Sequence, residues 1–232
     1  MFIPLKDLNP RRTYPVVNTL LILANVIVFL YQLTLTPRQF KVFELANATI
    51  PARIPAFLHG HTGFETAFLP IVTSMFLHAG LLHIAGNMLF LWIFGDNVED
   101  YFGHFGYLVF YFVCGIGAGL LHIAFNYHSS IPALGASGAI SGVMGAYIVL
   151  YPRAQVLTLV LIFLVPLPAF IILGYWFVLQ FMAGISSVGS AATGGVAVWA
   201  HVGGFLLGML ITFMSVGGQS ESRRRYSTPE NS

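Results

Sequence analysis

Two residues that lie far apart in the chain have the side chains needed for nucleophilic catalysis. Ser137 stands in the small-residue run 135–142 (GASGAISG), and His201 stands in the run 200–208 (AHVGGFLLG). A serine hydroxyl attacks a carbonyl carbon efficiently when a general base accepts its proton, and histidine most often provides that base. The two side chains could therefore perform acyl transfer, provided that the fold brings them within hydrogen-bonding distance.

The residues around Ser137 allow two interpretations. Glycines on both sides let another chain approach the hydroxyl closely. A helix that begins there would direct free N–H groups and the positive end of its dipole toward a developing oxyanion. Small residues are, however, also the usual contact surface between membrane helices. The motif alone leaves a nucleophile and a packing surface open.

Small residues near both positions favour close packing of the two helices. A lone histidine at a helix end is usually an interfacial residue, but Gly204 and Gly208 follow His201 on one helix face. A similar face at a spacing of four is formed by Ser137, Ser141 and Gly145. We expect the two faces to pack together and to bring the Ser137 hydroxyl to the His201 ring.

His83 and Asn87 are two further polar residues that share a predicted helix face. They lie four residues apart, a spacing that aligns side chains along an α-helix. Both can donate hydrogen bonds, as an oxyanion hole requires, although polar groups that bond a neighbouring loop would show the same pattern. His78 is off this face, and we interpret it as a residue that anchors a loop.

The positions of the acidic residues argue against a catalytic triad. None of them falls near the predicted helix starts at Ser137 and His201; the eight are Asp7, Glu44, Glu65, Asp96, Glu99, Asp100, Glu221 and Glu230. Any serine chemistry would therefore use a Ser–His dyad. A zinc site of His78, His83 and His201 is disfavoured, because the HExxH motif and any cysteine or carboxylate partner are missing. We predict no metal and no other cofactor.

The scarcity of charge indicates that these residues belong to a membrane protein. Of 232 residues, ten are Lys or Arg and eight are Asp or Glu, whereas 57% are hydrophobic and the mean hydropathy is +0.81. Soluble domains have about a quarter charged residues, and disordered chains are polar, so both classes are excluded. A net charge of +2, with Arg223–Arg225 as the one basic run, excludes a nucleic-acid partner. The single cysteine, Cys114, excludes an internal disulfide.

Four stretches without any charged residue are long enough for six membrane-spanning helices. They cover residues 13–37, 66–95, 101–152 and 154–220, and one span needs roughly 20 apolar residues. We predict an all-α, polytopic six-transmembrane-helix bundle, with spans near residues 16–35, 81–94, 105–125, 137–150, 156–181 and 200–216.

The segments between these spans also have predicted features. We expect an interfacial piece at 54–58 within the long connection 36–65, and an approach segment at 68–78 that is broken by Pro70. Further expectations are a polar turn at 95–100, prolines 166 and 168 in the middle of span 5, and a Gly/Ser/Ala-rich loop at 183–198.

The distribution of cations predicts the topology. We divide the chain into a cytoplasmic N-terminal segment (1–14), a six-span domain (15–217) and a cytoplasmic polar tail (218–232). Six spans put both termini on one side, which carries seven of the ten cations, so the positive-inside rule makes that side cytoplasmic. No cleavable signal peptide is evident. Spans 2, 4 and 6 then begin near the outer face, where their polar residues lie at similar depth.

The combination of these pieces resembles the rhomboid intramembrane serine proteases. The matching residues are the run 135–138 (GASG), Ala200-His201 with Gly203, Gly204 and Gly208, and His83 with Asn87. The Glu99 turn and the long connection 36–65 also fit, and the resemblance covers about residues 15–217.

The resemblance implies a role for each of these residues. Ser137 would be the nucleophile and His201 the general base, while His83, Asn87 and the Ser137 N–H would form the oxyanion hole. Span 5 and the loop 183–198 would gate and cap the site, although span 5 is equally interpreted as a lipid-facing helix with a proline kink. Ser141 stands where many relatives have an aromatic residue that packs on the histidine, which leaves open what orients the His201 ring. The Trp-Arg pair of the first loop in some relatives is also missing.

The function expected on this basis is cleavage of single-span transmembrane proteins near the outer membrane interface, in a bacterial plasma membrane. The partners would be transmembrane substrates and the lipid bilayer; no oligomeric state is predicted. One alternative is a catalytically inactive rhomboid-like binder of membrane proteins, which would have lost the serine or the histidine. Another is a small transporter or channel, which would show internal repeats or a charged residue within a span.

Overall fold

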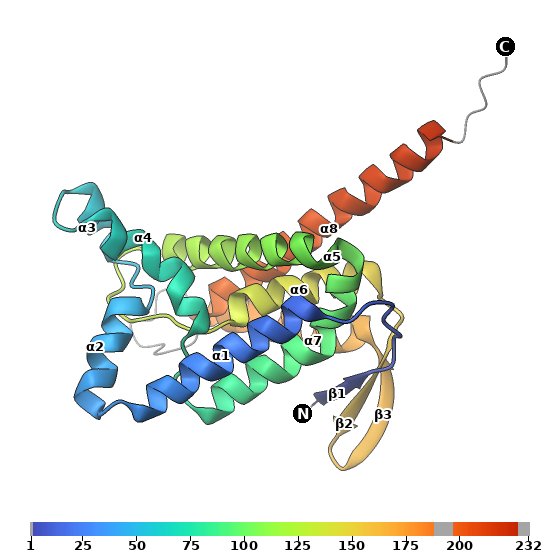
Figure 1. Ribbon diagram of the computed structural model, residues 1–232, viewed down its shortest axis with the longest axis horizontal. Helices are drawn as coiled ribbons and strands as arrows, with labels where there is room; N and C mark the ends of the chain where they lie inside the picture. Colours follow the sequence, from blue (N-terminus) through green and yellow to red (C-terminus); the bar gives the residue numbers. More distant parts are fainter. Residues whose placement is uncertain (1, 188–196, 227–232) are drawn as a thin grey trace.

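The prediction of a helical membrane bundle is confirmed. The computed structural model describes residues 2–187 and 197–226. The helices of the bundle pack side by side (Figure 1), and they are α1 (Val16–Thr34), α5 (Leu81–Phe125), α6 (Ser137–Leu150), α7 (Ala169–Ser187) and α8 (Val198–Tyr226). The central helix is α6, in which every residue from Gly138 to Tyr147 is buried. Predicted span 4 has the same bounds as α6.

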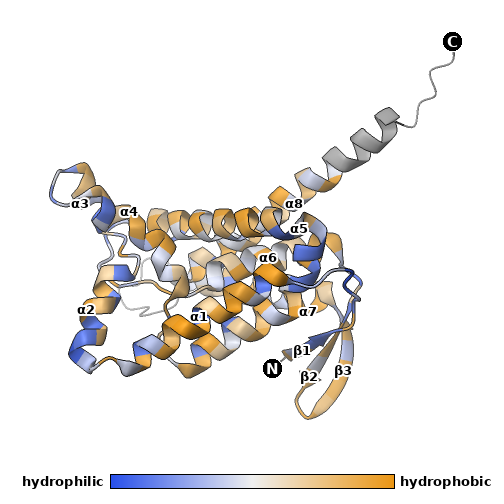
Figure 2. Cartoon of the chain, viewed as in Figure 1, coloured by the Kyte–Doolittle hydropathy of each residue, from blue (hydrophilic) through white to orange (hydrophobic). Residues whose placement is uncertain are grey.

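The bundle helices consist largely of hydrophobic residues (Figure 2), and many of the side chains that face outward are apolar, as contact with lipid requires. Large apolar side chains of α1 and α8 are more than half exposed, among them Leu20, Ile27, Leu33, Leu210 and Phe213. Within the described residues, four helices, α1, α5, α7 and α8, are long and apolar enough to cross a membrane. The 14 residues of α6 extend about 21 Å, less than the roughly 30 Å of a hydrocarbon core. The number of six crossings therefore stays a prediction.

Predicted spans 2 and 3 form one long helix with a sharp reversal at Gly103. Gly103 has φ 71° and ψ 165°, a conformation that favours glycine. Beyond it the chain runs back, and in the view of Figure 1 the two halves of α5 lie on opposite sides of α1 and α6. The polar turn predicted at 95–100 is wrong, because these residues continue the helix. Their polar side chains bond the N-terminal segment and α1 instead of forming a turn.

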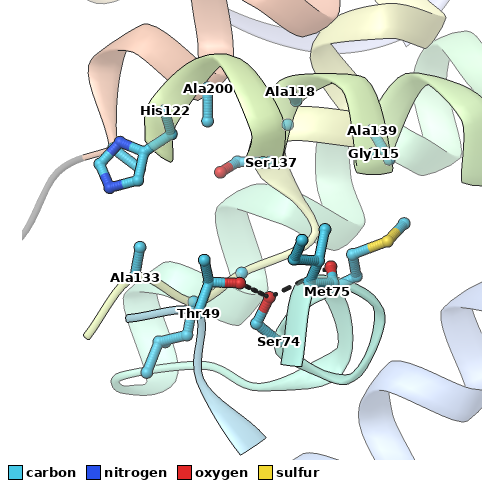
Figure 3. A pocket seen from close by; sticks show the side chains of 16 residues that line it. Thr49, Ser74, Met75, Gly115, Ala118, His122, Ala133, Ser137, Ala139 and Ala200 are labelled. Atoms are coloured by element: carbon cyan, nitrogen blue, oxygen red, sulfur yellow. Dashed lines mark hydrogen bonds between the residues drawn. The ribbon is translucent and has the colours of Figure 1, made fainter. Parts of the chain in front are cut away.

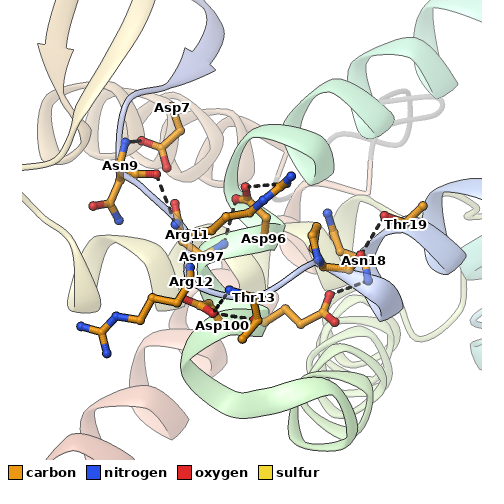
Figure 4. Close-up of polar contacts among 12 residues, drawn as sticks. Asp7, Asn9, Arg11, Arg12, Thr13, Asn18, Thr19, Asp96, Asn97 and Asp100 are labelled. Atoms are coloured by element: carbon orange, nitrogen blue, oxygen red, sulfur yellow. Dashed lines mark hydrogen bonds and ion pairs between the residues drawn. The ribbon is translucent and has the colours of Figure 1, made fainter.

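A buried polar network joins α1 to both halves of α5, and Figure 4 shows the part of it around Asn18 and the N-terminal segment. Glu99 is 1% exposed, and its carboxylate accepts the N–H groups of Val17 at 2.9 Å and Asn18 at 2.7 Å. The Asn18 amide donates to the Leu91 carbonyl at 3.1 Å and accepts the Tyr107 hydroxyl at 2.8 Å. Glu99 therefore satisfies the free N–H groups at the start of α1, and Asn18 connects the two halves of α5.

The same end of the bundle holds the N-terminal segment. Asp100 accepts the N–H groups of Arg12 and Thr13 at 3.0 and 2.9 Å, and the Arg11 guanidinium lies 3.6 Å from the Asp96 carboxylate. Gly95 leaves the space that the network needs, because a Cβ there would meet the Asn18 Oδ1 atom at 2.1 Å.

Predicted span 5 begins too early, because residues 155–168 form a β-hairpin. An antiparallel sheet of order β1-β2-β3 consists of β1 (Phe2–Asp7), β2 (Gln155–Val160) and β3 (Phe163–Pro168). Pro166 and Pro168 lack the N–H that a helix interior needs, whereas an edge strand tolerates proline. The prolines therefore lie in an edge strand, and α7 begins only at Ala169.

The connection between α1 and α5 is largely helical. It contains α2 (Pro37–Asn47), α3 (Arg53–Leu58), α4 (Phe64–Thr73) and a 3₁₀ turn, η1 (Ser74–Phe76). The predicted interfacial piece is α3. The predicted break at Pro70 is wrong, because α4 continues past it and the Pro70 carbonyl accepts the Ser74 N–H. A bridge between Thr49 and Ala133 ties this connection to the segment before α6.

We expect Glu99→Ala to destabilise the chain by about 2–3 kcal/mol, because two buried N–H groups of α1 lose charged acceptors. Denaturation of the detergent-solubilised protein, followed by circular dichroism, measures this loss. The control is Glu44→Ala, since Glu44 pairs with the exposed Lys41 and surface pairs contribute about 0–1 kcal/mol. Equal losses in the two variants would contradict the capping role of Glu99.

Candidate active site

Helices α6 and α8 approach so closely that their backbones touch. A Cβ at Gly204 would lie 2.0 Å from the Gly138 carbonyl oxygen, and a Cβ at Gly208 would lie 2.0 Å from that of Gly142. The predicted packing of the two small faces is therefore present, and the α6 face consists of Gly138, Gly142 and the predicted Gly145, where a Cβ would lie 2.1 Å from the Phe205 carbonyl oxygen. Ser141 is buried and donates to the Ser137 carbonyl at 2.6 Å.

This contact brings Ser137 and His201 together. The Ser137 Oγ atom at the start of α6 lies 2.7 Å from the His201 Nε2 atom in the first turn of α8. The other ring nitrogen of His201, Nδ1, lies 2.8 Å from the Gln180 Oε1 atom of α7. The Trp176 ring, also on α7, lies 5.9 Å from the imidazole, centroid to centroid.

The partners of the imidazole determine its tautomer. An amide oxygen only accepts hydrogen bonds, so the bond to Gln180 places the proton on the Nδ1 atom of His201. The Nε2 atom then keeps a lone pair that accepts the Ser137 hydroxyl proton. This is the arrangement that a serine nucleophile and its general base require.

Sequence reasoning missed Gln180. Its signal was present, because Gln180 is the one amide side chain in residues 156–181, the predicted span 5. A polar residue among apolar ones at membrane depth is often functional. Nothing in the local sequence of α7, however, indicates that the side chain faces the His201 ring.

His83 and Asn87 direct hydrogen-bond donors toward the segment before Ser137. The Ala79 N–H donates to the His83 Nδ1 atom at 3.3 Å, so the Nε2 atom of His83 carries the proton. A Cβ built on Gly135 would lie 2.8 Å from that Nε2 atom and 3.7 Å from the Asn87 Nδ2 atom. The Asn87 Nδ2 atom is buried and has no hydrogen-bond acceptor among the described residues. Both predicted residues therefore face the nucleophile's loop.

His78 anchors its segment through the main chain. Its N–H donates to the Gln32 side chain at 3.1 Å, and its carbonyl accepts the Gln32 amide at 3.0 Å. The His78 ring packs on the His83 ring, with centroids 5.1 Å apart. The His78 ring thus packs against His83, the predicted oxyanion-hole donor, and it does not line the cleft beside Ser137.

A cleft of about 340 Å³ opens in front of the dyad. Its polar lining includes Ser137, His201, His83 and Asn87, and its apolar lining comes from Leu82, Phe90, Ile140, Met144 and Trp176. The cleft therefore combines a place for an apolar chain segment with donors and a nucleophile on one wall.

A second, smaller cavity of about 40 Å³ lies on the other side of Ser137 (Figure 3). His122 and Ala200 line it beside the serine, and Thr49 and Ser74, whose hydroxyls bond each other at 2.9 Å, line it on the side away from Ser137. A polar cavity of this size holds one or a few water molecules.

Most of the predicted loop 183–198 lies outside the described residues, since α7 ends at Ser187 and α8 begins at Val198.

Comparisons with known proteins show which proteins the chain is similar to. A family model described as "Rhomboid domain" matches residues 65–217. Rhomboid protein 1, mitochondrial, of Saccharomyces cerevisiae is 30% identical over 173 residues, which are 70% of this chain and 46% of that protein. RHOMBOID-like protein 12, mitochondrial, of Arabidopsis thaliana is 32% identical over 157 residues, 57% of this chain and 46% of the relative. Rhomboid protease GluP of Bacillus subtilis is 38% identical over 89 residues, 38% of this chain and 17% of GluP. The chain spans about half the length of the first two relatives.

We expect Gly208→Val to destabilise the protein by about 1–3 kcal/mol, because the new side chain must push α6 and α8 apart. Denaturation in detergent micelles measures the change. Gly217→Val is the matched control on α8, since a Cβ at Gly217 meets no atom within 4 Å. Wild-type stability of Gly208→Val would show that the bundle does not need this contact.

Proposed function

The chain belongs to the rhomboid family, and from this we propose that it is an intramembrane serine endopeptidase with a Ser137–His201 dyad. The observation that supports the proposal most strongly is the 2.7 Å hydrogen bond between the Ser137 Oγ and His201 Nε2 atoms. One member of the family, that of Bacillus subtilis, is named a protease.

The first half of the reaction forms an acyl-enzyme. The His201 Nε2 atom accepts the Ser137 proton while the Oγ atom attacks the scissile carbonyl carbon. The oxyanion accepts hydrogen bonds from the His83 Nε2–H and the Asn87 amide, and from the free N–H groups at the start of α6. The Asn87 donor has no acceptor among the described residues, so we assign its hydrogen bond to the transition state, where it accelerates the reaction.

The second half releases the products. The protonated Nε2 atom of His201 gives its proton to the leaving amine as the C–N bond breaks. A water molecule then transfers a proton to the same Nε2 atom and attacks the acyl carbon. The Ser137 Oγ atom leaves and regains the proton, and a carboxylic acid is released. The small cavity behind Ser137 is suited to supplying this water.

The substrate class follows from the cleft and its place in the bundle. The apolar lining at Leu82, Phe90 and Met144 suits a segment of a transmembrane protein with a single span. Such a segment must unwind before its carbonyl reaches Ser137, because a helix holds its carbonyls in its own hydrogen bonds. Substrates with glycine, proline or polar residues near the membrane interface should therefore be preferred.

We propose that both termini lie on the cation-rich side of the membrane and that the dyad opens toward the other side. The assignment to a bacterial plasma membrane gains little from the relatives. The one of yeast and several of Arabidopsis are named mitochondrial or chloroplastic, beside one from Bacillus subtilis. A catalytically inactive binder is the main alternative, and it is disfavoured by the intact Ser137–His201 pair.

We further propose that Gln180 positions the general base. Its Oε1 atom holds the Nδ1–H of His201, which fixes both the tautomer and the ring plane, while Trp176 packs beside the ring. In many relatives, an aromatic residue four positions after the serine packs on the histidine and orients it. In this chain we assign that orienting role to Gln180 and Trp176 of α7. Ser141, which occupies that position here, is bonded to the Ser137 carbonyl.

Ser137→Ala and His201→Ala should each lower the cleavage of a single-span transmembrane reporter by at least about 10³-fold, because each removes half of the dyad. The measurement is cleavage by purified protein in proteoliposomes, together with labelling by a fluorophosphonate, which should mark wild type but not Ser137→Ala. The exposed loop variants Ser130→Ala and His128→Ala are the controls. Cleavage at the wild-type rate by both dyad variants would refute the mechanism.

Gln180→Leu should lower kcat about 10- to 100-fold with little change in KM, because the Nδ1–H of the half-buried His201 ring loses its acceptor. Gln180→Glu should keep activity and move the acidic limb of the pH–rate profile to higher pH, since a carboxylate favours the protonated ring. Leu179→Ala, at a side chain that is 48% exposed, controls for changes in α7. An unaltered pH profile in the Glu variant and an unaltered kcat in the Leu variant would show that Gln180 does not position His201.

A further inference from the structure

The turn of the β2–β3 hairpin is unusually apolar for an exposed turn. Val160 pairs with Phe163, so Leu161 and Ile162 form a two-residue turn, and they are 77% and 82% exposed. Phe163 and Leu164 beside them are 64% and 58% exposed. Leu161 has φ 56°, a conformation for which glycine or asparagine is the usual choice. Large apolar side chains thus occupy a turn where neither packing nor local geometry favours them.

Only the base of the hairpin packs against the bundle. Val156 and Thr158 of β2 are fully buried, and Leu167 of β3 contacts the main core. From there the hairpin extends sideways past the edge of the bundle (Figure 1), at the end opposite Ser137 on α6. Six strand residues span about 20 Å, so the tip lies well beyond the helices, and no described part of the chain covers it.

The position of the hairpin identifies the surface that it meets. β3 ends at Pro168 and α7 begins at the next residue, and the exposed Phe170 and Ile171 of α7 already belong to the outward surface of a helix that can cross the membrane. The apolar tip is therefore connected to the lipid-facing side of the bundle by a few residues of extended chain. A side chain that projects laterally from this point meets bilayer before it meets any other partner.

The charges around the hairpin agree with a membrane surface. Lys6 of β1, Arg12 and Arg153 are exposed at this end of the bundle. The carboxylates of Asp96 and Asp100 are already engaged by the chain. Exposed cations beside a cluster of large apolar side chains are the pattern of an interfacial anchor, in which the apolar groups enter the acyl boundary and the cations contact anionic headgroups.

We propose that the tip of the hairpin, Leu161 to Leu164, inserts into the headgroup–acyl boundary of the leaflet on the side opposite the Ser137–His201 pair. The partner is the bilayer surface, with anionic lipid near Lys6, Arg12 and Arg153. The anchor would hold the start of α7, and with it the sheet that contains β1, at a fixed depth. The proposal does not depend on catalysis. The anchor can therefore be absent in an active protease, and it can be present in a chain without protease activity.

The test is a depth measurement at the tip. Ile162→Cys is made in a Cys114→Ala background, labelled with an environment-sensitive fluorophore, and reconstituted into phosphatidylcholine vesicles with or without phosphatidylglycerol. We expect lipid-attached nitroxide to quench the label several-fold more than it quenches a label at Gln155→Cys, the exposed residue at the base of the same hairpin. Aqueous iodide should show the opposite order. Phe163→Cys serves as a second tip position if the first variant folds poorly.

Three results would decide the proposal. Strong quenching of the tip label by lipid nitroxide would support insertion. Quenching that increases with phosphatidylglycerol, and decreases in the double variant Lys6→Gln and Arg153→Gln, would support a contribution from anionic headgroups. Ready quenching by iodide in both lipid compositions would overturn it. Protection that increases with the protein-to-lipid ratio would also overturn it, because a second copy of the chain would then cover the tip.

Discussion

The structure depends above all on the contact between the backbones of α6 and α8. Helices with ordinary side chains between them pack 8–10 Å apart, whereas Gly138, Gly142, Gly204 and Gly208 leave room for no Cβ at all. A Cβ at Gly142 would also meet the Cys114 Cβ atom of α5 at 2.4 Å, so three helices converge at one residue. The distance between Ser137 and His201 is therefore fixed by backbone contact, which is stiffer than contact through flexible side chains.

The remaining donors depend on the opposite end of the bundle. His83 and Asn87 lie on the first half of α5, and the polar network of Glu99 and Asn18 joins that half to α1 and to the second half. Because α5 reverses at Gly103, the network helps to set how the two halves lie relative to each other, with α1 bonded to both. Polar groups that never reach the site thus determine where its donors lie relative to α6.

Much of this arrangement could be predicted from local patterns, and the rest depends on contacts between distant segments. Small residues at a spacing of four were enough to predict that α6 and α8 meet, and α6 has its predicted bounds of Ser137–Leu150. The hairpin could not be predicted, because residues 155–168 are as apolar as a span and their strand pairing is completed by β1, about 150 residues earlier. The reversal at Gly103 was misplaced for a related reason: the polar residues 95–100 suggested a turn, but their partners lie in the N-terminal segment and α1.

The identity of residue 180 is consistent with the scarcity of charge. An ionised carboxylate at membrane depth is costly unless it is paired, and none of the described carboxylates lies near the His201 ring. An amide oxygen orients the same Nδ1–H without adding a charge. In the proposed reaction the site is neutral before attack, and the imidazolium and the oxyanion appear together and disappear together. The oxyanion then balances the charge of the imidazolium. Because Gln180 is neutral, it orients the base without adding a charge, and the low-dielectric site holds one ion pair, between the imidazolium and the oxyanion.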